Sequence, residues 1–431
     1  MFDMIDIVPV RRLVESGLLG YIVVCMSSPI LDTRTKAYDL LARYFQQLEL
    51  QQSQGLLAGS GFRERPQIHL LLDTFRGAIE QPYAQISPLL TVFVAEALPI
   101  LLRPGHAVYP QINNFLLARP CLDLTDVPMY YSTFNSGRPT ARAERIWILK
   151  ILTRGLQSDS DVKLCARRHC FTATMAVLKS EQDDKVVSNL CREFLIRAAS
   201  LSAGTDHLLR RAGVGAWLMA LKDDENWTDR FVSVMLKHES EEPALRLQLQ
   251  AVVRDRVFKA EQQSNITALK IENLCKCVES SSVFLTPQEL SIVLGYVRSF
   301  FPGRVDMLNL FYAASPSEVA RSSNITSASV YMTLVSCVSD RDGFLCRFQG
   351  SDVITRAKRW IDRMIEVEAS LVLSDDEGDD DDDDDDDGII EEIRFQNVFD
   401  FVLGNNHKSS SAAEGFYDAF SNEDFSLSLL N

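Results

Sequence analysis

The stretch TPQELSIVLGYVRSFF, residues 286–301, decides the fold class of this chain. Thr286 is a good helix N-cap, and Pro287 suits the first helical position. The apolar residues that follow recur three or four positions apart, which places them on one face of an α-helix: Leu290, Val293, Leu294, Val297 and Phe301. The stretch therefore predicts an amphipathic helix with one buried face.

The same periodicity recurs along most of the chain, and short polar or proline-containing segments separate its copies. No run of alternating apolar and polar residues predicts β-strands. Helices are expected over residues 10–26, 32–51, 64–81, 87–103, 141–156, 161–179, 184–200, 203–221, 227–238, 243–262, 266–279, 289–301, 327–338 and 352–370.

This pattern predicts an all-α fold. Successive helix pairs are spaced about 35–45 residues apart, as in HEAT and armadillo repeats. Because no repeated consensus occurs, we expect an irregular HEAT/armadillo-like α-solenoid of antiparallel helix pairs over residues 1–370. A compact helical bundle is the alternative.

The charge is concentrated at one end. The 431 residues have a net charge of −15, but from Asp375 onward there are 19 acidic and 2 basic residues. The preceding 374 residues hold 40 acidic and 42 basic ones, so a body-wide basic field is excluded. Residues 379–387 are all aspartate, which predicts a disordered acidic tail over 371–390. Residues 391–431 mix acidic and aromatic residues and would either dock on the body or bind a partner.

The sequence offers no arrangement of residues for catalysis. It contains no phosphate-binding loop, dinucleotide fingerprint, nucleophile elbow or metalloprotease motif. Cys165, His169 and Cys170 lack the second ligand pair that zinc sites usually have. The nine scattered cysteines favour reduced thiols and an intracellular protein. We expect no enzyme activity, cofactor, metal, small-molecule substrate or membrane span.

Several basic residues gather on predicted helices. They are either a solvated face, or a surface that contacts RNA phosphates or an acidic protein segment, the chain's own acidic tail included. Arg210-Arg211 adds a further pair. The candidate contact residues are Arg142, Lys150, Arg154, Lys163 and Arg167.

One stretch, residues 104–171, is more specific than generic helix. It contains Pro104-Gly105-His106, Tyr109-Pro110, Asn114-Phe115-Leu116-Leu117, Arg119-Pro120, Leu122-Asp123-Leu124, Asp126-Val127-Pro128-Met129-Tyr130, Glu144-Arg145, Trp147-Ile148-Leu149-Lys150-Ile151-Leu152, Gly155-Leu156, Asp161, Leu164, Arg167-Arg168-His169 and Phe171. It resembles the C-terminal domain of the nucleolar pre-ribosomal-associated protein family, and the similarity extends over about residues 60–220.

The resemblance implies a non-catalytic ribosome assembly factor of the nucleus and nucleolus. Members of this family are very large helical-repeat proteins of early large-subunit (60S) assembly. The expected role is a scaffold that supports maturation of large-subunit rRNA and 5.8S rRNA from the primary transcript. The implied partners are pre-ribosomal proteins, assembly factors and pre-rRNA. A generic HEAT/armadillo adaptor in trafficking or signalling is the alternative.

The motif also has a structural interpretation. Glu144 falls on the same helix face as Trp147, Ile148 and Ile151, so its carboxylate should be buried. A buried carboxylate needs a partner, and we expect Arg119 or Arg168. Glu144, Trp147, Arg119 and Arg168 are therefore candidates for a structural lock, or alternatively for a contact surface.

Overall fold

The computed structural model describes residues 10–53, 62–180, 183–221, 225–238, 243–262, 266–278, 285–322, 325, 327–338 and 352–375. These residues form 20 α-helices and one 3-10 helix, and no strand occurs among them, which confirms the all-α class. Apart from Asp375 itself, the acidic and aromatic tail from Asp375 onward lies outside the described residues.

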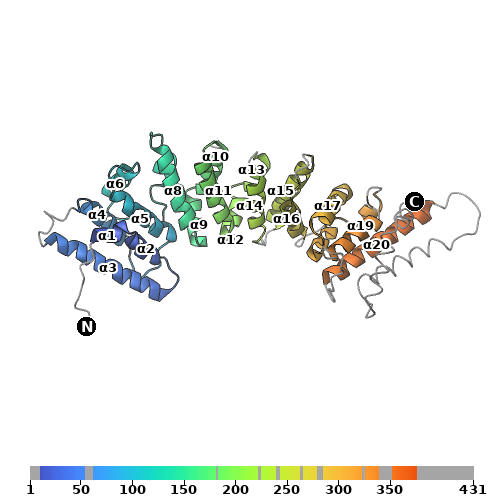
Figure 1. The fold of residues 1–431 in the computed structure, drawn as a ribbon, viewed down its shortest axis with the longest axis horizontal. Helices are drawn as coiled ribbons and strands as arrows, with labels where there is room; N and C mark the ends of the chain where they lie inside the picture. Colours follow the sequence, from blue (N-terminus) through green and yellow to red (C-terminus); the bar gives the residue numbers. More distant parts are fainter. Residues whose placement is uncertain are drawn as a thin grey trace, which may run out of the picture. The chain divides into compact units, whose positions relative to one another are not determined.

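The chain divides into two compact units, residues 1–248 and 249–431 (Figure 1). The helices of unit 1 are α1 (Val10–Glu15), α2 (Leu18–Cys25), α3 (Leu31–Ser53), α4 (Arg65–Arg76), α5 (Pro88–Leu101), α6 (Tyr109–Leu117), α7 (Tyr130–Phe134), α8 (Ala141–Gly155), α9 (Asp159–Arg167), α10 (Cys170–Ser180), α11 (Lys185–Ala199), α12 (Ser202–Arg210), α13 (Val214–Ala220) and α14 (Glu225–Met235). Helix α15 (Pro243–Gln262) crosses the boundary, and unit 2 continues with α16 (Ala268–Val278), α17 (Pro287–Phe300), η2 (Val305–Ala313), α18 (Pro316–Ala320), α19 (Ser327–Val338) and α20 (Asp352–Asp375).

Helix α17 forms as its sequence predicts. The Thr286 hydroxyl accepts a hydrogen bond from the backbone N–H of Glu289 at 3.3 Å. The Glu289 carboxylate in turn accepts one from the backbone N–H of Thr286 at 2.9 Å, which completes a capping box. The predicted apolar face is buried, so periodicity and capping agree on this helix.

Three predicted helices are each divided in two. The expected helices 10–26, 161–179 and 203–221 are interrupted at Gly17, His169 and Gly213, whose φ angles are 77°, 53° and 68°. A residue in this left-handed region ends a helix, and glycine adopts it without a Cβ clash. The apolar spacing continues across these breaks, so periodicity alone does not reveal them. The sequence also did not predict η2.

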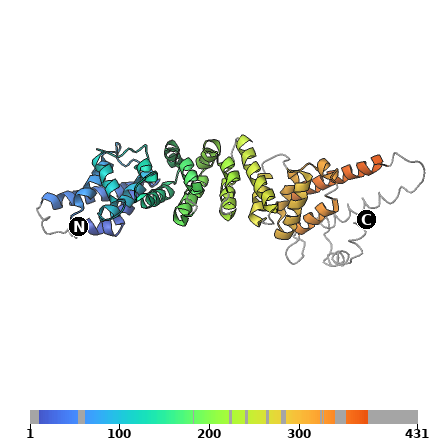
Figure 2. The ribbon, with the colours of Figure 1, turned by 90° about the horizontal axis from the view of Figure 1, so that it is seen from above.

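The core of unit 1 is a row of neighbouring helices. Helix α5 packs on α2 and α8, α8 also packs on α11, and α11 also packs on α14 (Figures 1 and 2). Between α5 and α8, the rings of Phe93 and Trp147 lie 5.8 Å apart between centroids. The buried side chains of α8 and α11 are mostly apolar, and the burial of apolar surface is the main source of stability in such a row.

Helices α8 and α11 run in the same direction. Near the start of α8, Arg142 reaches Asp184, the N-cap residue of α11. Near the end of α11, the Arg197 guanidinium donates a hydrogen bond to the Leu156 carbonyl, which follows α8, at 2.9 Å. The two contacts fix the register of this helix pair at both ends.

A buried carboxylate ties α9 to α5. Asp161 is fully buried and accepts hydrogen bonds from the hydroxyls of Ser87 at 2.6 Å and Ser158 at 2.7 Å. The backbone N–H groups of Gln157 and Ser158 donate to the same carboxylate. Ser87 is the N-cap residue of α5, so one acidic side chain organises the starts of two helices.

Unit 2 has its own core. Helix α20 packs on α18, α19 and η2, and η2 packs on α16. The rings of Phe311 and Trp360 stack with centroids 5.5 Å apart, and the indole N–H of Trp360 donates to the Ala314 carbonyl at 3.1 Å. The Arg254 guanidinium binds both oxygens of the Glu289 carboxylate and so joins α15 to α17.

The described cysteines are all free thiols, and six of the eight are buried. This agrees with the prediction of reduced, mostly buried cysteines. Within the described part of the chain, no helix is long and apolar enough to cross a membrane.

The close approach of α8 to α5 gives a first prediction. A Cβ added at Gly155, the last residue of α8, would lie 2.7 Å from the Cα of Leu89 in α5. Because backbone cannot move aside cheaply, Gly155→Ala should lower the free energy of unfolding by about 1–3 kcal/mol. Urea denaturation followed by circular dichroism measures this loss.

The matched control is Gly105→Ala, because an added Cβ there meets no atom within 4 Å. We expect that variant to unfold within about 0.5 kcal/mol of the natural sequence. Equal stability of the two variants would show that α5 and α8 do not depend on this close approach.

Candidate functional site

The predicted structural lock is centred on Glu144 in α8. As expected, its side chain is fully buried. Its Oε1 accepts hydrogen bonds from the Thr140 hydroxyl at 2.5 Å and from the Gln111 amide of α6 at 2.8 Å. Its Oε2 lies 3.8 Å from Nη1 of Arg138. The carboxylate therefore holds together α6, α8 and the segment before α8.

The prediction that Arg119 or Arg168 pairs with Glu144 was wrong. Arg119 lies over the ring of Phe115, 4.9 Å from its centroid. Arg168 binds both oxygens of Asp126. The helical wheel places Glu144 on the buried face, but it does not tell which loop lies opposite, and here that loop carries Arg138 and Thr140.

Trp147 stands one turn after Glu144 and packs against α5. It is 5% exposed, and its indole N–H has no hydrogen-bond partner among the described residues. Oε1 of Gln111 and Oε2 of Glu144 are also buried without a hydrogen bond there.

Arg168, the C-cap residue of α9, forms a second lock. Its bidentate ion pair with Asp126 fixes the guanidinium, whose Cζ lies 5.4 Å from the centroid of the Tyr131 ring. The Tyr131 hydroxyl donates to the Arg168 carbonyl at 3.1 Å. These contacts fasten the start of α7 to the end of α9.

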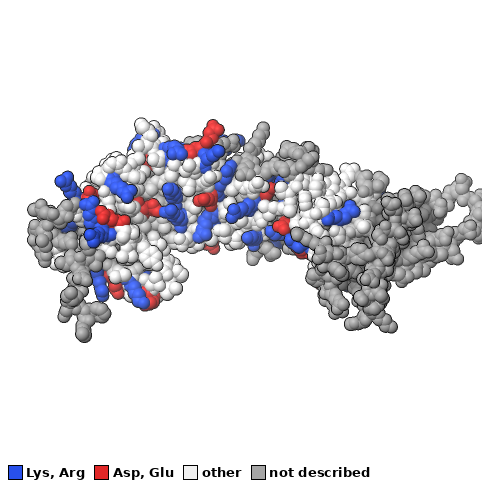
Figure 3. All heavy atoms as spheres, in the orientation of Figure 1, with Lys and Arg blue, Asp and Glu red and all other residues white. Residues whose placement is uncertain are grey.

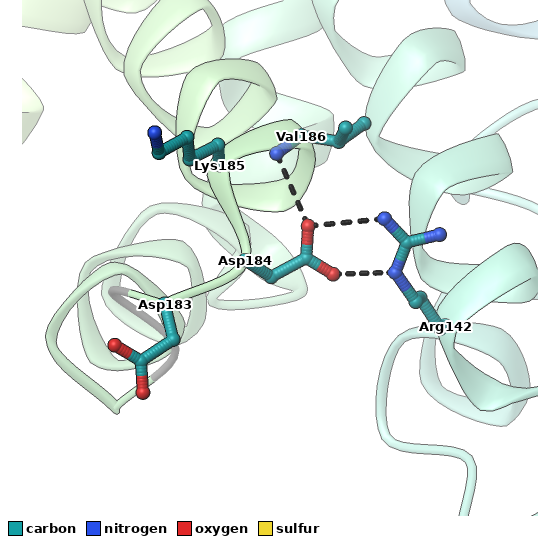
Figure 4. Close-up of a pocket in the computed structure, with 5 residues that line it drawn as sticks. All are labelled: Arg142, Asp183, Asp184, Lys185 and Val186. Atoms are coloured by element: carbon teal, nitrogen blue, oxygen red, sulfur yellow. Dashed lines mark hydrogen bonds and ion pairs between the residues drawn. The ribbon is translucent and has the colours of Figure 1, made fainter.

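Two of the five candidate contact residues are engaged in ion pairs between helices. Arg142 binds Asp184, with Nε and Oδ2 2.5 Å apart, in a shallow hollow in which Asp183 and Lys185 point away from the pair (Figure 4). This hydrogen bond lowers the pKa of Asp184, whose carboxylate also caps α11. Arg154 pairs with Glu96 of α5. Both arginines connect α8 to its neighbours.

The other three candidates are exposed. Lys150 lies on the outer face of α8, and Lys163 and Arg167 lie one turn apart on α9. None of the three forms an ion pair within the described residues. On the face seen in Figure 3, basic side chains are scattered among acidic ones, so any contact surface must be local.

Helix α9 packs on α12, and exposed or half-buried basic residues lie on these two helices and directly after them. We call this group the α9–α12 surface, and its residues are Lys163, Arg167, His169, His207 and Arg211. Burial lowers the pKa of His207, and the nearby positive charges of Arg211 and His169 lower it further. The sequence analysis named the pair Arg210-Arg211. Arg210 forms an ion pair with Asp206 at 2.7 Å, so only Arg211 of this pair is included in the surface.

Sequence reasoning missed His169 and His207 as members of this surface. They are 38 positions apart in the chain, and only the packing of α9 on α12 brings them together. The ring of His207 also lies 5.3 Å from that of Phe171, between centroids, at the start of α10. The left-handed conformation of His169 turns the chain between α9 and α10 at this point.

Comparison with known proteins identifies the region that carries these residues. Residues 19–217 match a family model described as nucleolar pre-ribosomal-associated protein 1. This part of the chain is therefore similar to a domain of those proteins. The match contains the whole motif stretch 104–171, which confirms the resemblance to the nucleolar pre-ribosomal-associated proteins seen in the sequence.

Two relatives extend the comparison. Nucleolar pre-ribosomal-associated protein 1 of Mus musculus is 29% identical over 230 residues, which cover 53% of this chain and 10% of the mouse protein. Its Homo sapiens counterpart is 28% identical over 219 residues, which cover 51% of this chain and 9% of the human protein. The chain thus matches about a tenth of the length of these relatives. No solved structure matches it.

The Glu144 lock gives a second prediction. In Glu144→Ala, the amide of Gln111 and the hydroxyl of Thr140 lose their acceptor inside the protein. We expect the free energy of unfolding to fall by about 2–4 kcal/mol, as measured by urea denaturation. The control is Glu193→Ala, an exposed glutamate on α11 that should change stability by less than about 0.5 kcal/mol. A loss no larger than that of the control would contradict the lock.

His207 gives a third prediction, on pH. Its pKa in the folded protein is below the ordinary value of 6.5, so the unfolded chain binds the proton more readily. Stability should therefore fall as the pH drops below about 6.5. Urea unfolding at about pH 7.5 and pH 5.5 should show a larger loss for the natural sequence than for His207→Gln. Equal losses of unfolding free energy in the two proteins would show that His207 does not contribute to the pH dependence of stability.

Proposed function

We propose that this chain is a non-catalytic assembly factor of the large (60S) ribosomal subunit. It would act in the nucleolus as a scaffold in early pre-ribosomes and support maturation of large-subunit rRNA and 5.8S rRNA from the primary transcript. The observation that carries this proposal is the match of residues 19–217 to the nucleolar pre-ribosomal-associated proteins.

The way the polar side chains are used supports a scaffold. Glu144, Asp161 and the Arg168–Asp126 pair each connect two or more helices or loops. Arg142 and Arg154 do the same between α8 and its neighbours. Polar groups committed to helix contacts serve to hold a surface in a fixed shape, which is what a scaffold requires.

The row of helices in unit 1 supports a repeat architecture. We propose that α5, α8, α11 and α14 form part of an irregular HEAT/armadillo-like α-solenoid. Each helix of the row contacts its predecessor and its successor, as in repeat proteins whose units contact only their neighbours. Such arrays expose extended surfaces on which proteins and RNA can be held side by side.

Pre-ribosomal proteins, assembly factors and pre-rRNA are the proposed partners. Lys150, Lys163 and Arg167 are the best candidates for phosphate contacts, because their charges are exposed and form no ion pair among the described residues. Arg142 and Arg154 would first have to leave Asp184 and Glu96. Phosphate contacts of this kind position an RNA without reading its sequence.

Affinity purification tests the function. A tagged chain should recover large-subunit precursors together with nucleolar assembly factors, and a fluorescent fusion should gather in the nucleolus. Recovery of cytosolic trafficking or signalling proteins alone would refute the proposal in favour of a HEAT/armadillo adaptor.

Charge reversal gives a fourth prediction. The triple variant Lys150→Glu, Lys163→Glu and Arg167→Glu should crosslink to pre-rRNA several-fold less than the natural chain, because three phosphate contacts become repulsive. Crosslinking followed by sequencing of the bound RNA measures the change.

The control reverses two exposed arginines elsewhere in unit 1, Arg12→Glu and Arg43→Glu. Both sets leave the core untouched, so circular dichroism should be unchanged in each. Equal crosslinking of the two variants would assign Lys150, Lys163 and Arg167 to an ordinary solvated face.

A further inference from the structure

A stacking platform lies beside the α9–α12 surface. It consists of the Tyr131 ring, 46% exposed, and the Arg168 guanidinium that lies over it, on a side chain that is 40% exposed. Both groups are planar, and both present part of their surface to solvent. Planar aromatic rings and guanidinium groups are the side chains on which unpaired bases stack.

The platform is held in place before any ligand arrives. Asp126 binds Arg168 through both carboxylate oxygens, and the Tyr131 hydroxyl donates to the Arg168 carbonyl at 3.1 Å. The Tyr131 ring also makes an edge contact with Tyr130, which is buried, with centroids 5.3 Å apart. A fixed pair of planes loses little conformational entropy when a base stacks on it.

Exposed basic residues lie next to the platform in the chain. Arg167 precedes Arg168 in the chain, and His169 follows it. His169 and Arg211 are both close enough to His207 to lower its pKa, and Phe171, two residues after His169, lies 5.3 Å from His207 between ring centroids. Arg167 and Arg211 are exposed, whereas the acidic residues Asp126 and Asp206 are each bound by an arginine of their own.

We propose that the Tyr131–Arg168 platform and the α9–α12 surface together bind single-stranded RNA. One base stacks on the platform, and the adjoining phosphates lie along Arg167, His169 and Arg211. Asp126 neutralises the charge of Arg168, so this residue contributes a plane while the exposed arginines contribute the charge. Cations beside a stacking plane are what an unpaired strand requires, whereas an acidic peptide would gain nothing from the plane.

This inference rests on the proposed function, because it assigns to one surface the RNA that the scaffold would hold. Binding of a labelled single-stranded RNA of about ten nucleotides to the full chain, followed by fluorescence anisotropy, tests it. Tyr131→Ala should weaken binding about fivefold or more, because the stacked base loses its platform. Tyr131→Phe keeps the ring and loses only the hydrogen bond to the Arg168 carbonyl, so it should bind more tightly than Tyr131→Ala.

The matched control is Tyr21→Ala on α2, because Tyr21 is 67% exposed and lies on a different helix. It should not change RNA binding. A second variant, Arg167→Glu with Arg211→Glu, leaves the platform intact and should both weaken binding and flatten its salt dependence. This double variant keeps the proposal testable if Tyr131→Ala does not fold.

Three results would contradict the proposed RNA site. The first is that the natural chain binds no RNA, and the second is that it binds a duplex RNA as tightly as the single strand. The third result is unchanged RNA binding by both the charge variant and a folded Tyr131→Ala. Displacement of the RNA by an aspartate-rich peptide, together with insensitivity to Tyr131→Ala, would assign the surface to an acidic protein partner. If the tagged chain still recovers large-subunit precursors in any of these cases, only this site fails. Loss of that recovery would refute the proposed function itself.

Discussion

Buried carboxylates that accept hydrogen bonds from more than one element hold the matched region of the chain together. Glu144 and Asp161 are both fully buried, and a carboxylate removed from water needs donors inside the protein. Glu144 finds its donors on α6 and on the segment before α8, while Asp161 finds them at the starts of α5 and α9. Glu144 therefore couples α6 to α8, and Asp161 couples α5 to α9, because a shift within either pair would take hydrogen bonds away from a buried carboxylate.

Steric contact sets the spacing that these hydrogen bonds require. Helix α8 can approach α5 closely because position 155 has no side chain. The ion pairs Arg142–Asp184 and Arg154–Glu96 lie nearer the surface, where solvent screens the charges and each pair contributes little to stability. Packing thus decides where the helices lie, and the ion pairs of Arg142 and Arg154 add contacts from α8 to α11 and to α5.

The sequence was sufficient for the elements with strong local signals and insufficient where neighbours decide. Helix α17 could be predicted because its capping box and its apolar face lie within sixteen residues. The breaks at Gly17 and His169 could not be predicted, because an apolar stripe continues across a left-handed residue. The burial of Glu144 followed from its helix face, but its partners lie on other elements. Likewise, the sequence does not distinguish Arg142 from Lys150 as candidate contact residues. In the structure, Arg142 forms an ion pair with Asp184, whereas Lys150 is exposed.

The turn at His169 has a mechanical consequence. A non-glycine residue in the left-handed region stores conformational energy, which the surrounding structure must balance. Here the balance comes from Arg168 on one side, fastened to Asp126, and from the stacked rings of Phe171 and Phe194 on the other, with centroids 5.4 Å apart. The corner between α9 and α10 is therefore held by contacts on both sides. Loss of the Arg168–Asp126 ion pair or of the Phe171–Phe194 stack would change the angle between these two helices.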